Sequence, residues 1–158
     1  MIDTPKYQAL LENIKNQYDK HITIKIVNDI NQFCKQHGVN IGNHSPFSPA
    51  IALKPRTIVI ASQIDKDSPI ERIERCGFKN IVEQLRINDV DFLIHLLLHE
   101  LAHLLNNWPQ EHECDCDKWA FEEMRKLKQI VKYDLNDLEI YDTANSFLIR
   151  SKKWRKTK

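Results

Sequence analysis

Residues 89–105, with the sequence DVDFLIHLLLHELAHLL, decide the fold. Their periodicity predicts a helix from Asp89 to about Asn106, because apolar side chains lie on every side of it. Asn88 is a suitable N-cap, and acidic residues in the first turn suit the positive end of the helix dipole. Pro109 prevents the helix from continuing. A helix that is apolar all round is expected to be buried at the centre of the domain.

Two histidines and a glutamate interrupt this apolar helix, and a buried charge needs a partner or a metal ion. His99 and His103 are four residues apart, so they differ by roughly 40° around the axis and about 6 Å along it. Two imidazoles so placed can bind one zinc ion. Glu100 lies about 100° away, beside the ion, where it can take a proton from the attacking water without being a ligand.

A catalytic zinc usually has three protein ligands, and the following helix can supply the third. This helix is predicted from near Gln110 to about Lys132, and the short turn before it predicts an αα-hairpin. Glu113 is the predicted third ligand. Asp117 lies four residues further on the same helical face, where it can accept a hydrogen bond from His99 or His103 and fix its orientation.

Two further histidines have alternative roles. His112 could replace Glu113 as ligand, but adjacent helical residues point apart, so only one of them can bind. Glu113 is favoured because Asp117 lies on its face of the helix. His95 joins the histidine stripe as an extra ligand, a transition-state donor or, as we favour, a hydrogen-bonded histidine in the cleft wall. The oxyanion donor stays open among His95, His112, Tyr133, Tyr141 and Arg150.

The cysteines predict no disulfide scaffold. Four cysteines are few for this length, and a reducing cytoplasm is the expected location. Residues two apart on a helix face different ways, so Cys114 and Cys116 are not expected to bind a metal together. Cys116 is predicted to be a small core residue against the histidine helix, while Cys34 and Cys76 give no functional signal.

The pattern His99-Glu-x-x-His103 followed by Glu113-x-x-x-Asp117 resembles the gluzincin metallopeptidases, and most of all their small ImmA/IrrE-type domain. The segment ECDCDKWA, residues 113–120, is similar to that family's Glu-x-x-Ala-Asp/Asn-x-x-Ala, with Cys116 where Ala is usual. The resemblance covers residues 92–124, and residues 22–61 match in element type and order only. Phage-exclusion proteases of the Lit type have a similar layout.

This resemblance implies a compact zincin-like fold, one zinc ion and hydrolysis of peptide bonds, with Glu100 as general base. Family members often cleave repressors or other proteins encoded by mobile elements. The chain departs from the family in two places. Only nine residues separate His103 from Glu113, and residues 63–87 look like an insertion between strand and histidine helix. The alternative function is a non-catalytic zinc-stabilised binding or sensor module acting through a protein or nucleic-acid partner.

The remaining segments predict one helix-dominated α+β domain over residues 1–158. The strongest strand signal is Thr57-Ile-Val-Ile60, whose edge could hold an extended substrate, although a strand of an ordinary core sheet would have the same residues. Thr4 is a plausible N-cap for the first helix, and Gly38 a plausible C-terminal stop for the second. The predicted helices cover residues 5–20, 22–38 (with 22–24 as an alternative strand), 70–86 interrupted near Gly77, and 136 onward, and the predicted strands cover residues 50–53 and 56–61.

Charge and hydropathy exclude other protein classes. The formal charge of the chain is +1, so nucleic acid is an unlikely partner; only the basic tail, residues 150–158, could contact it. Residues 92–105 form the longest hydrophobic stretch, which is too short to span a bilayer, and the N-terminus has no signal-peptide pattern. The expected partner is an intracellular protein or peptide substrate, with no membrane involved.

Overall fold

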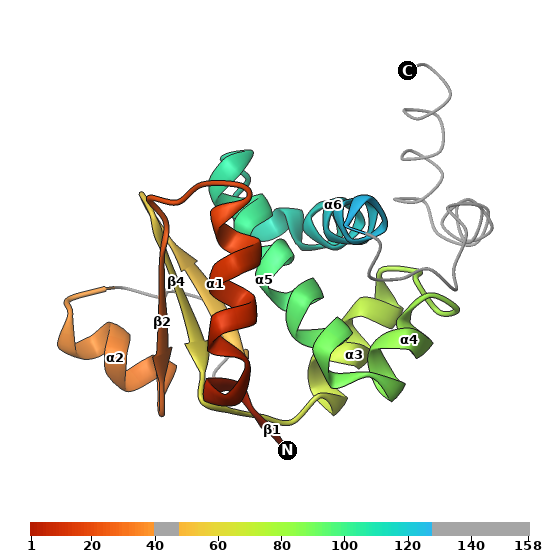
Figure 1. Ribbon diagram of the computed structural model, residues 1–158, viewed down its shortest axis with the longest axis horizontal. Helices are drawn as coiled ribbons and strands as arrows, with labels where there is room; N and C mark the ends of the chain where they lie inside the picture. Colours follow the sequence, from red (N-terminus) through yellow and green to blue (C-terminus); the bar gives the residue numbers. More distant parts are fainter. Residues whose placement is uncertain (40–47, 128–158) are drawn as a thin grey trace.

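The fold is built around helix α5 (Asp89–Leu105), which a computed structural model of residues 1–39 and 48–127 places at the centre of the molecule (Figure 1). Every side chain of α5 from Asp91 to His103 is buried. The Asn88 side chain accepts a hydrogen bond from the Asp91 amide, as the predicted N-cap should. The apolar character of the helix on all sides is therefore explained by neighbours on all sides: α1, α4, α6 and the sheet all contact it.

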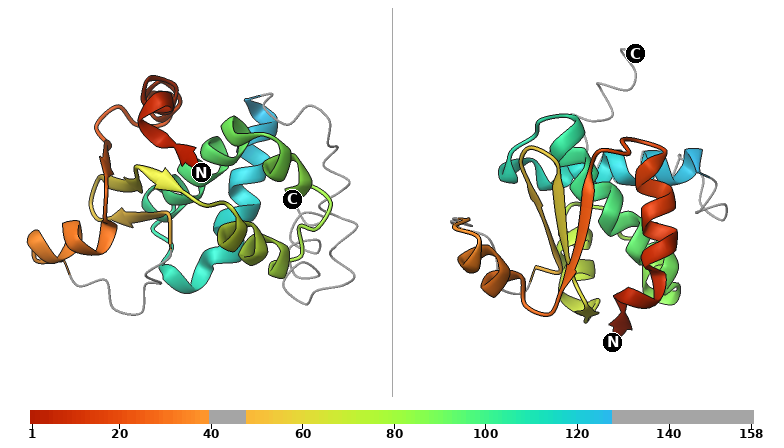
Figure 2. Two further views of the ribbon diagram at one scale, coloured as in Figure 1. Left: turned by 90° about the horizontal axis from the view of Figure 1, so that it is seen from below. Right: turned by 60° about the vertical axis from the view of Figure 1, so that its left-hand side comes forward.

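A three-stranded sheet covers one side of α5. Its order is β2 (Thr23–Val27), β4 (Thr57–Ala61), β3 (Ala50–Leu53), with β2 parallel and β3 antiparallel to the central β4. Alternation along β4 sends Ile58 and Ile60 into the main core and Val59 into a smaller cluster under α2 (Ile30–Gln36). Figure 2 shows α2 on the side of the sheet away from α1. The two predicted strands are confirmed.

The helix predicted over residues 22–38 is wrong in its first part, which is strand β2, as the alternative strand at residues 22–24 had indicated. Isoleucines at positions 22, 26 and 30 suit a helical repeat, but Thr23–Val27 pairs along its whole length with β4. Asp29 then accepts a hydrogen bond from the Gln32 amide and starts α2. The predicted stop at Gly38 is confirmed, with a left-handed φ of 66°.

The N-terminus adds elements that the pattern did not predict. β1 (Ile2–Asp3) pairs antiparallel with β5 (Gln63–Ile64), and a 3-10 turn, η1 (Thr4–Tyr7), leads into α1 (Gln8–Asn16). The prediction of Thr4 as N-cap is wrong: this buried hydroxyl donates instead to the Ala61 carbonyl at 2.7 Å. The N-terminus is thus attached to the end of β4.

The segment between sheet and α5 forms two helices, α3 (Asp67–Arg75) and α4 (Val82–Ile87), separated at Gly77 as predicted. This segment packs as part of the core, since α4 contacts α5. A disulfide between Cys76 and Cys114 joins the end of α3 to the first turn of α6. The sequence around Cys76 gave no signal of this pairing.

The predicted αα-hairpin is present. After α5, the chain turns through Asn107, which has a positive φ of 54°, passes a 3-10 turn η2 (Gln110–His112) and enters α6 (Glu113–Lys126) against α5. The predicted extension of this helix to Lys132 and the helix and tail beyond it lie outside the described residues. The α+β class dominated by helices is confirmed. No helix within residues 1–39 and 48–127 combines the length and apolar character needed to cross a membrane.

Candidate metal centre

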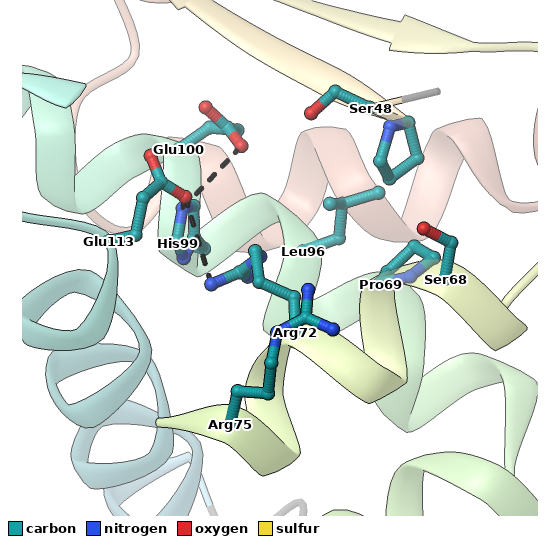
Figure 3. A pocket seen from close by; sticks show the side chains of 10 residues that line it. Ser48, Ser68, Pro69, Arg72, Arg75, Leu96, His99, Glu100 and Glu113 are labelled. Atoms are coloured by element: carbon teal, nitrogen blue, oxygen red, sulfur yellow. Dashed lines mark hydrogen bonds and ion pairs between the residues drawn. The ribbon is translucent and has the colours of Figure 1, made fainter. Parts of the chain in front are cut away.

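The hairpin brings the three predicted ligands together. The Nε2 atom of His99 lies 2.8 Å from one Glu113 carboxylate oxygen, and the Nε2 atom of His103 lies 3.1 Å from the other. Figure 3 shows the carboxylates of Glu113 and Glu100 on the same side of the His99 imidazole. Helix α5 supplies both imidazoles and α6 supplies the carboxylate, so the convergence depends on the packing of these two helices.

These separations suit a bound metal ion. Donor atoms on a tetrahedral zinc ion are about 3.3 Å apart, because each bond is about 2.0–2.1 Å long. The observed nitrogen–oxygen distances, 2.8 and 3.1 Å, are shorter than that spacing by about 0.5 and 0.2 Å. Two imidazoles and one carboxylate are also a donor set typical of catalytic zinc. The residues present therefore fit a zinc ion with small side-chain shifts.

Asp117 on α6 is hydrogen-bonded to two histidines of α5. It is fully buried, and its Oδ1 atom accepts hydrogen bonds from Nδ1 of His99 at 2.7 Å and from Nε2 of His95 at 3.0 Å. The hydrogen bond to His99 fixes the imidazole so that its Nε2 atom faces Glu113. His103 is oriented differently, since its Nδ1 atom donates to the Trp108 carbonyl at 2.8 Å. The sequence predicted either His99 or His103 as a hydrogen-bond donor to Asp117, and in the structure it is His99.

Arg72 on α3 is a site residue that sequence patterns missed. Its two terminal nitrogens donate to both oxygens of Asp117, at 2.7 and 3.1 Å, and one of them lies 3.8 Å from Glu113. A two-pronged pair of this kind is a strong charge-assisted interaction. The Cys76–Cys114 disulfide links the same two helices four residues after Arg72 and one residue after Glu113. Arg72 is thus the positive charge that makes burial of Asp117 possible.

Glu100 lies beside the cluster. It is 5% exposed, its Oε2 atom is 4.0 Å from Nε2 of His99, and with His99 and Glu113 it lines a cavity of about 160 Å³. Burial raises the pKa of the Glu100 carboxyl, while the neighbouring imidazoles act in the opposite direction. Its position next to a cavity, close to the ligand atoms but not bonded to them, is the placement required of a proton acceptor.

His95 and His112 stand apart from the ligand set. His95 is hydrogen-bonded, as expected, but it is buried against Phe121 and does not line the cavity, so its predicted place in the cleft wall is wrong. Burial lowers its pKa, and its Nδ1 atom has no hydrogen-bond partner among the described residues. The Nδ1 atom of His112 lies 2.9 Å from a carboxylate oxygen of Asp115. The imidazoles that contact Glu113 are those of His99 and His103. Neither His95 nor His112 lines the cavity beside Glu100, and the other candidates for an oxyanion donor (Tyr133, Tyr141 and Arg150) lie outside the described residues.

Cys116 is closer to the cluster than its predicted core role required. It is fully buried, as expected, yet its sulfur lies within 4.8 Å of ligand atoms of His99 and His103. Burial raises the pKa of its thiol, and nearby carboxylates add to this, so the metal-free protein holds it in the thiol form. His95, His99 and Asp117 form a second compact group, which their hydrogen bonds already explain.

The charges of the cluster predict how pH affects the metal-free protein. Burial opposes ionisation of His99, but the Asp117 carboxylate and hydrogen bonds outweigh it and raise its pKa to about 10. This imidazolium therefore contributes stability that is complete below pH 6.5 and is lost as pH rises towards 10. Glu113 and Asp117 have lowered pKa values despite burial, so their contribution is lost only in acid.

The expected result is a free energy of unfolding that falls between about pH 7 and pH 9 when the metal is removed. Urea unfolding in the presence of a chelator measures it. His95 acts in the opposite sense, but its contribution changes below this interval, around the ordinary histidine pKa of 6.5. A free energy of unfolding that rises over the same interval would contradict the described hydrogen-bond network.

Comparison with known proteins finds no match to the chain among family models, curated proteins or solved structures. The geometry of the described residues and the sequence motif therefore carry the functional argument by themselves.

Proposed function

We propose that the chain is a zinc metalloendopeptidase of the gluzincin type, similar to ImmA/IrrE-type domains, that hydrolyses peptide bonds of an intracellular protein substrate. One observation carries the proposal: two Nε2 atoms of adjacent α5 histidines face one α6 carboxylate, beside a glutamate that lines a cavity. This combination supplies three ligands, a proton acceptor and space for a substrate.

The chemistry divides between the ion and the chain. A zinc ion held by His99, His103 and Glu113 would acidify water and polarise the scissile carbonyl. Glu100 accepts one proton as the water oxygen attacks the carbonyl carbon, and it passes this proton to the leaving nitrogen as the carbon–nitrogen bond breaks. Asp117 holds His99 in its ligating orientation throughout, because it accepts a hydrogen bond from the nitrogen that faces away from the ligand position. Arg72 acts through Asp117, since it donates hydrogen bonds to that carboxylate.

The sheet offers a place for an extended peptide, although not at the predicted strand. Thr57–Ile60 does not offer a free edge, because β4 is the central strand and both of its edges are occupied; the alternative, that these residues belong to an ordinary core sheet, is confirmed. β3 is the outer strand beside α5, and Ser48 and Pro49, which precede it, line the cavity. A substrate paired with the outer edge of β3 would pass the mouth of the cavity.

A second candidate function is a zinc-stabilised binding or sensor module without turnover. The burial of His99, Glu100 and His103 favours it, because deeply buried ligands are also typical of structural metal sites. The experiment that separates the two is a proteome-wide search for protein fragments in cells producing the wild-type chain and in cells producing Glu100→Gln. The peptidase proposal requires fragments that appear only with the wild-type chain.

The cytoplasmic location is part of this proposal. The pairing of Cys76 with Cys114 bears on it, because disulfides are uncommon in reducing compartments. Thiol labelling of the protein in intact cells tests the location: a reducing cytoplasm predicts that both cysteines are labelled.

A further inference from the structure

We propose that the cavity beside the metal centre is a subsite for an acidic side chain of the peptide substrate, and that Arg75 determines this specificity. The inference rests on the proposed peptidase function and names the substrate class of the same site. The cavity is lined by two of the predicted ligands, His99 and Glu113, by the predicted base Glu100, and by Ser48, Pro49, Ser68, Pro69, Arg72, Arg75 and Leu96.

The two arginines of the cavity have different surroundings. They lie three residues apart on α3 and therefore on neighbouring positions of one helix face. Arg72 is engaged with Asp117 and reaches towards Glu113, as Figure 3 shows. Arg75 is exposed, and no carboxylate pairs with it among residues 1–39 and 48–127. Its guanidinium is thus available to a ligand that enters the cavity.

The charge of the loaded site favours a negative ligand. Glu100, Glu113 and Asp117 are the three carboxylates of the cluster. Arg72 and a divalent cation together balance these three negative charges. Arg75 is then an uncompensated positive charge on the wall of a cavity next to the reacting bond, where it attracts a carboxylate.

The lining also suits the shape of a short acidic side chain. Pro49, Pro69 and Leu96 provide apolar walls for its methylene groups, while Ser48 and Ser68 add hydroxyl groups. A volume of about 160 Å³ accommodates a single side chain and excludes a folded segment. Arg75 can pair with the carboxylate in the two-pronged geometry that guanidinium groups favour.

The adjoining cavity limits the acidic preference to one position. This larger space, about 590 Å³, shares Ser48, Pro49 and Ser68 with the first. Its charged side chains are Asp29, Asp65 and Asp67, and Met1 with its terminal amino group also lines it. These aspartates repel a carboxylate. An acidic residue of a peptide that crosses both cavities is therefore stabilised only in the cavity with the arginines.

Digestion and capture of a randomised peptide library test this proposal. The zinc-loaded full chain is expected to cleave peptides enriched in Glu or Asp at one position relative to the cut. Arg75→Ala should lower kcat/KM for an acidic peptide about tenfold, as expected for loss of one charge-assisted pair, and leave its Gln analogue unchanged. Arg75→Glu should reverse the preference towards Lys and Arg. Lys79→Ala removes an exposed positive charge near α3 but outside the cavity lining, so it should behave like the wild-type chain.

Capture of the library on immobilised Glu100→Gln protein gives a readout that needs no turnover. Acid-enriched capture that disappears with Arg75→Ala supports the subsite even if nothing is cleaved, and in that case only the peptidase function fails. Cleavage with no acidic preference overturns the subsite and leaves the peptidase function standing. Capture without acid enrichment, or enrichment that survives Arg75→Ala, also overturns the subsite.

Discussion

Glu100→Gln is expected to reduce peptide hydrolysis by about a thousandfold, because a side-chain amide cannot accept the proton that the attacking water must lose. Glutamine has the shape of glutamate, so the buried position at the cavity wall stays filled. Glu100 is also 4.0 Å from the His99 nitrogen and is not a predicted ligand. Zinc content and the melting temperature should therefore stay close to those of the wild-type chain. The measurements are kcat/KM on a cleaved peptide, zinc analysis and thermal unfolding.

Glu111→Gln is the matched control for this prediction. Glu111 is an exposed glutamate just before α6, outside the cavity lining, and the same chemical change there should leave hydrolysis intact. A Glu100→Gln chain that retains full hydrolysis would contradict the assignment of Glu100 as the base. Lost hydrolysis together with lost zinc would also contradict it, since Glu100 would then support the ion and not only the proton transfer.

Arg72→Ala is expected to lower the free energy of unfolding by about 3 kcal/mol, because it leaves the Asp117 carboxylate buried without its cation. Asp117 is 0% exposed and accepts hydrogen bonds from both terminal nitrogens of Arg72. The expected loss is at the lower end for a broken buried pair, since His95 and His99 still donate to Asp117. Urea unfolding measures it, and zinc affinity should fall in parallel because the His99 orientation loosens.

Two comparisons make the Arg72 result specific. Arg75→Ala removes a guanidinium from the same helix without touching Asp117, so its effect on stability should be within about 0.5 kcal/mol. Adding Asp117→Asn to Arg72→Ala should cost less than the sum of the two single changes, because the charge that Arg72 balances is then absent. Equal stability losses for Arg72→Ala and Arg75→Ala, or strict additivity of the pair, would contradict the described role of Arg72.

The candidate metal centre could be predicted from sequence because its parts are local. Helical spacing alone places His99 near His103 and Glu113 near Asp117, and a short turn forces the two helices into a hairpin. Arg72 could not be predicted in this way. Its side chain reaches Asp117 across a sequence separation of 45 residues, and nothing in the pattern of α3 indicates which face meets α6.

The errors in the fold prediction have the same origin. Ile22, Ile26 and Ile30 satisfy a helical period, and only the pairing of β2 with β4 selects the strand. β1 and β5 are two residues long, too short for any alternation to be visible. The Cys76–Cys114 pair joins positions 38 residues apart, and four cysteines offer several pairings that sequence cannot distinguish. In each case the local structure depends on a contact with residues that are distant in the sequence.

Zinc stoichiometry of the purified full chain, measured after reconstitution and removal of loosely bound metal, tests the central claim most directly. We predict one zinc ion per wild-type chain and its loss in His99→Ala, His103→Ala and Glu113→Ala, with Cys116→Ser retaining it. A wild-type chain that holds no zinc would contradict the account. So would a Glu113→Ala chain that keeps its ion while Cys116→Ser loses it, because the third ligand would then be the thiol beside the two imidazoles.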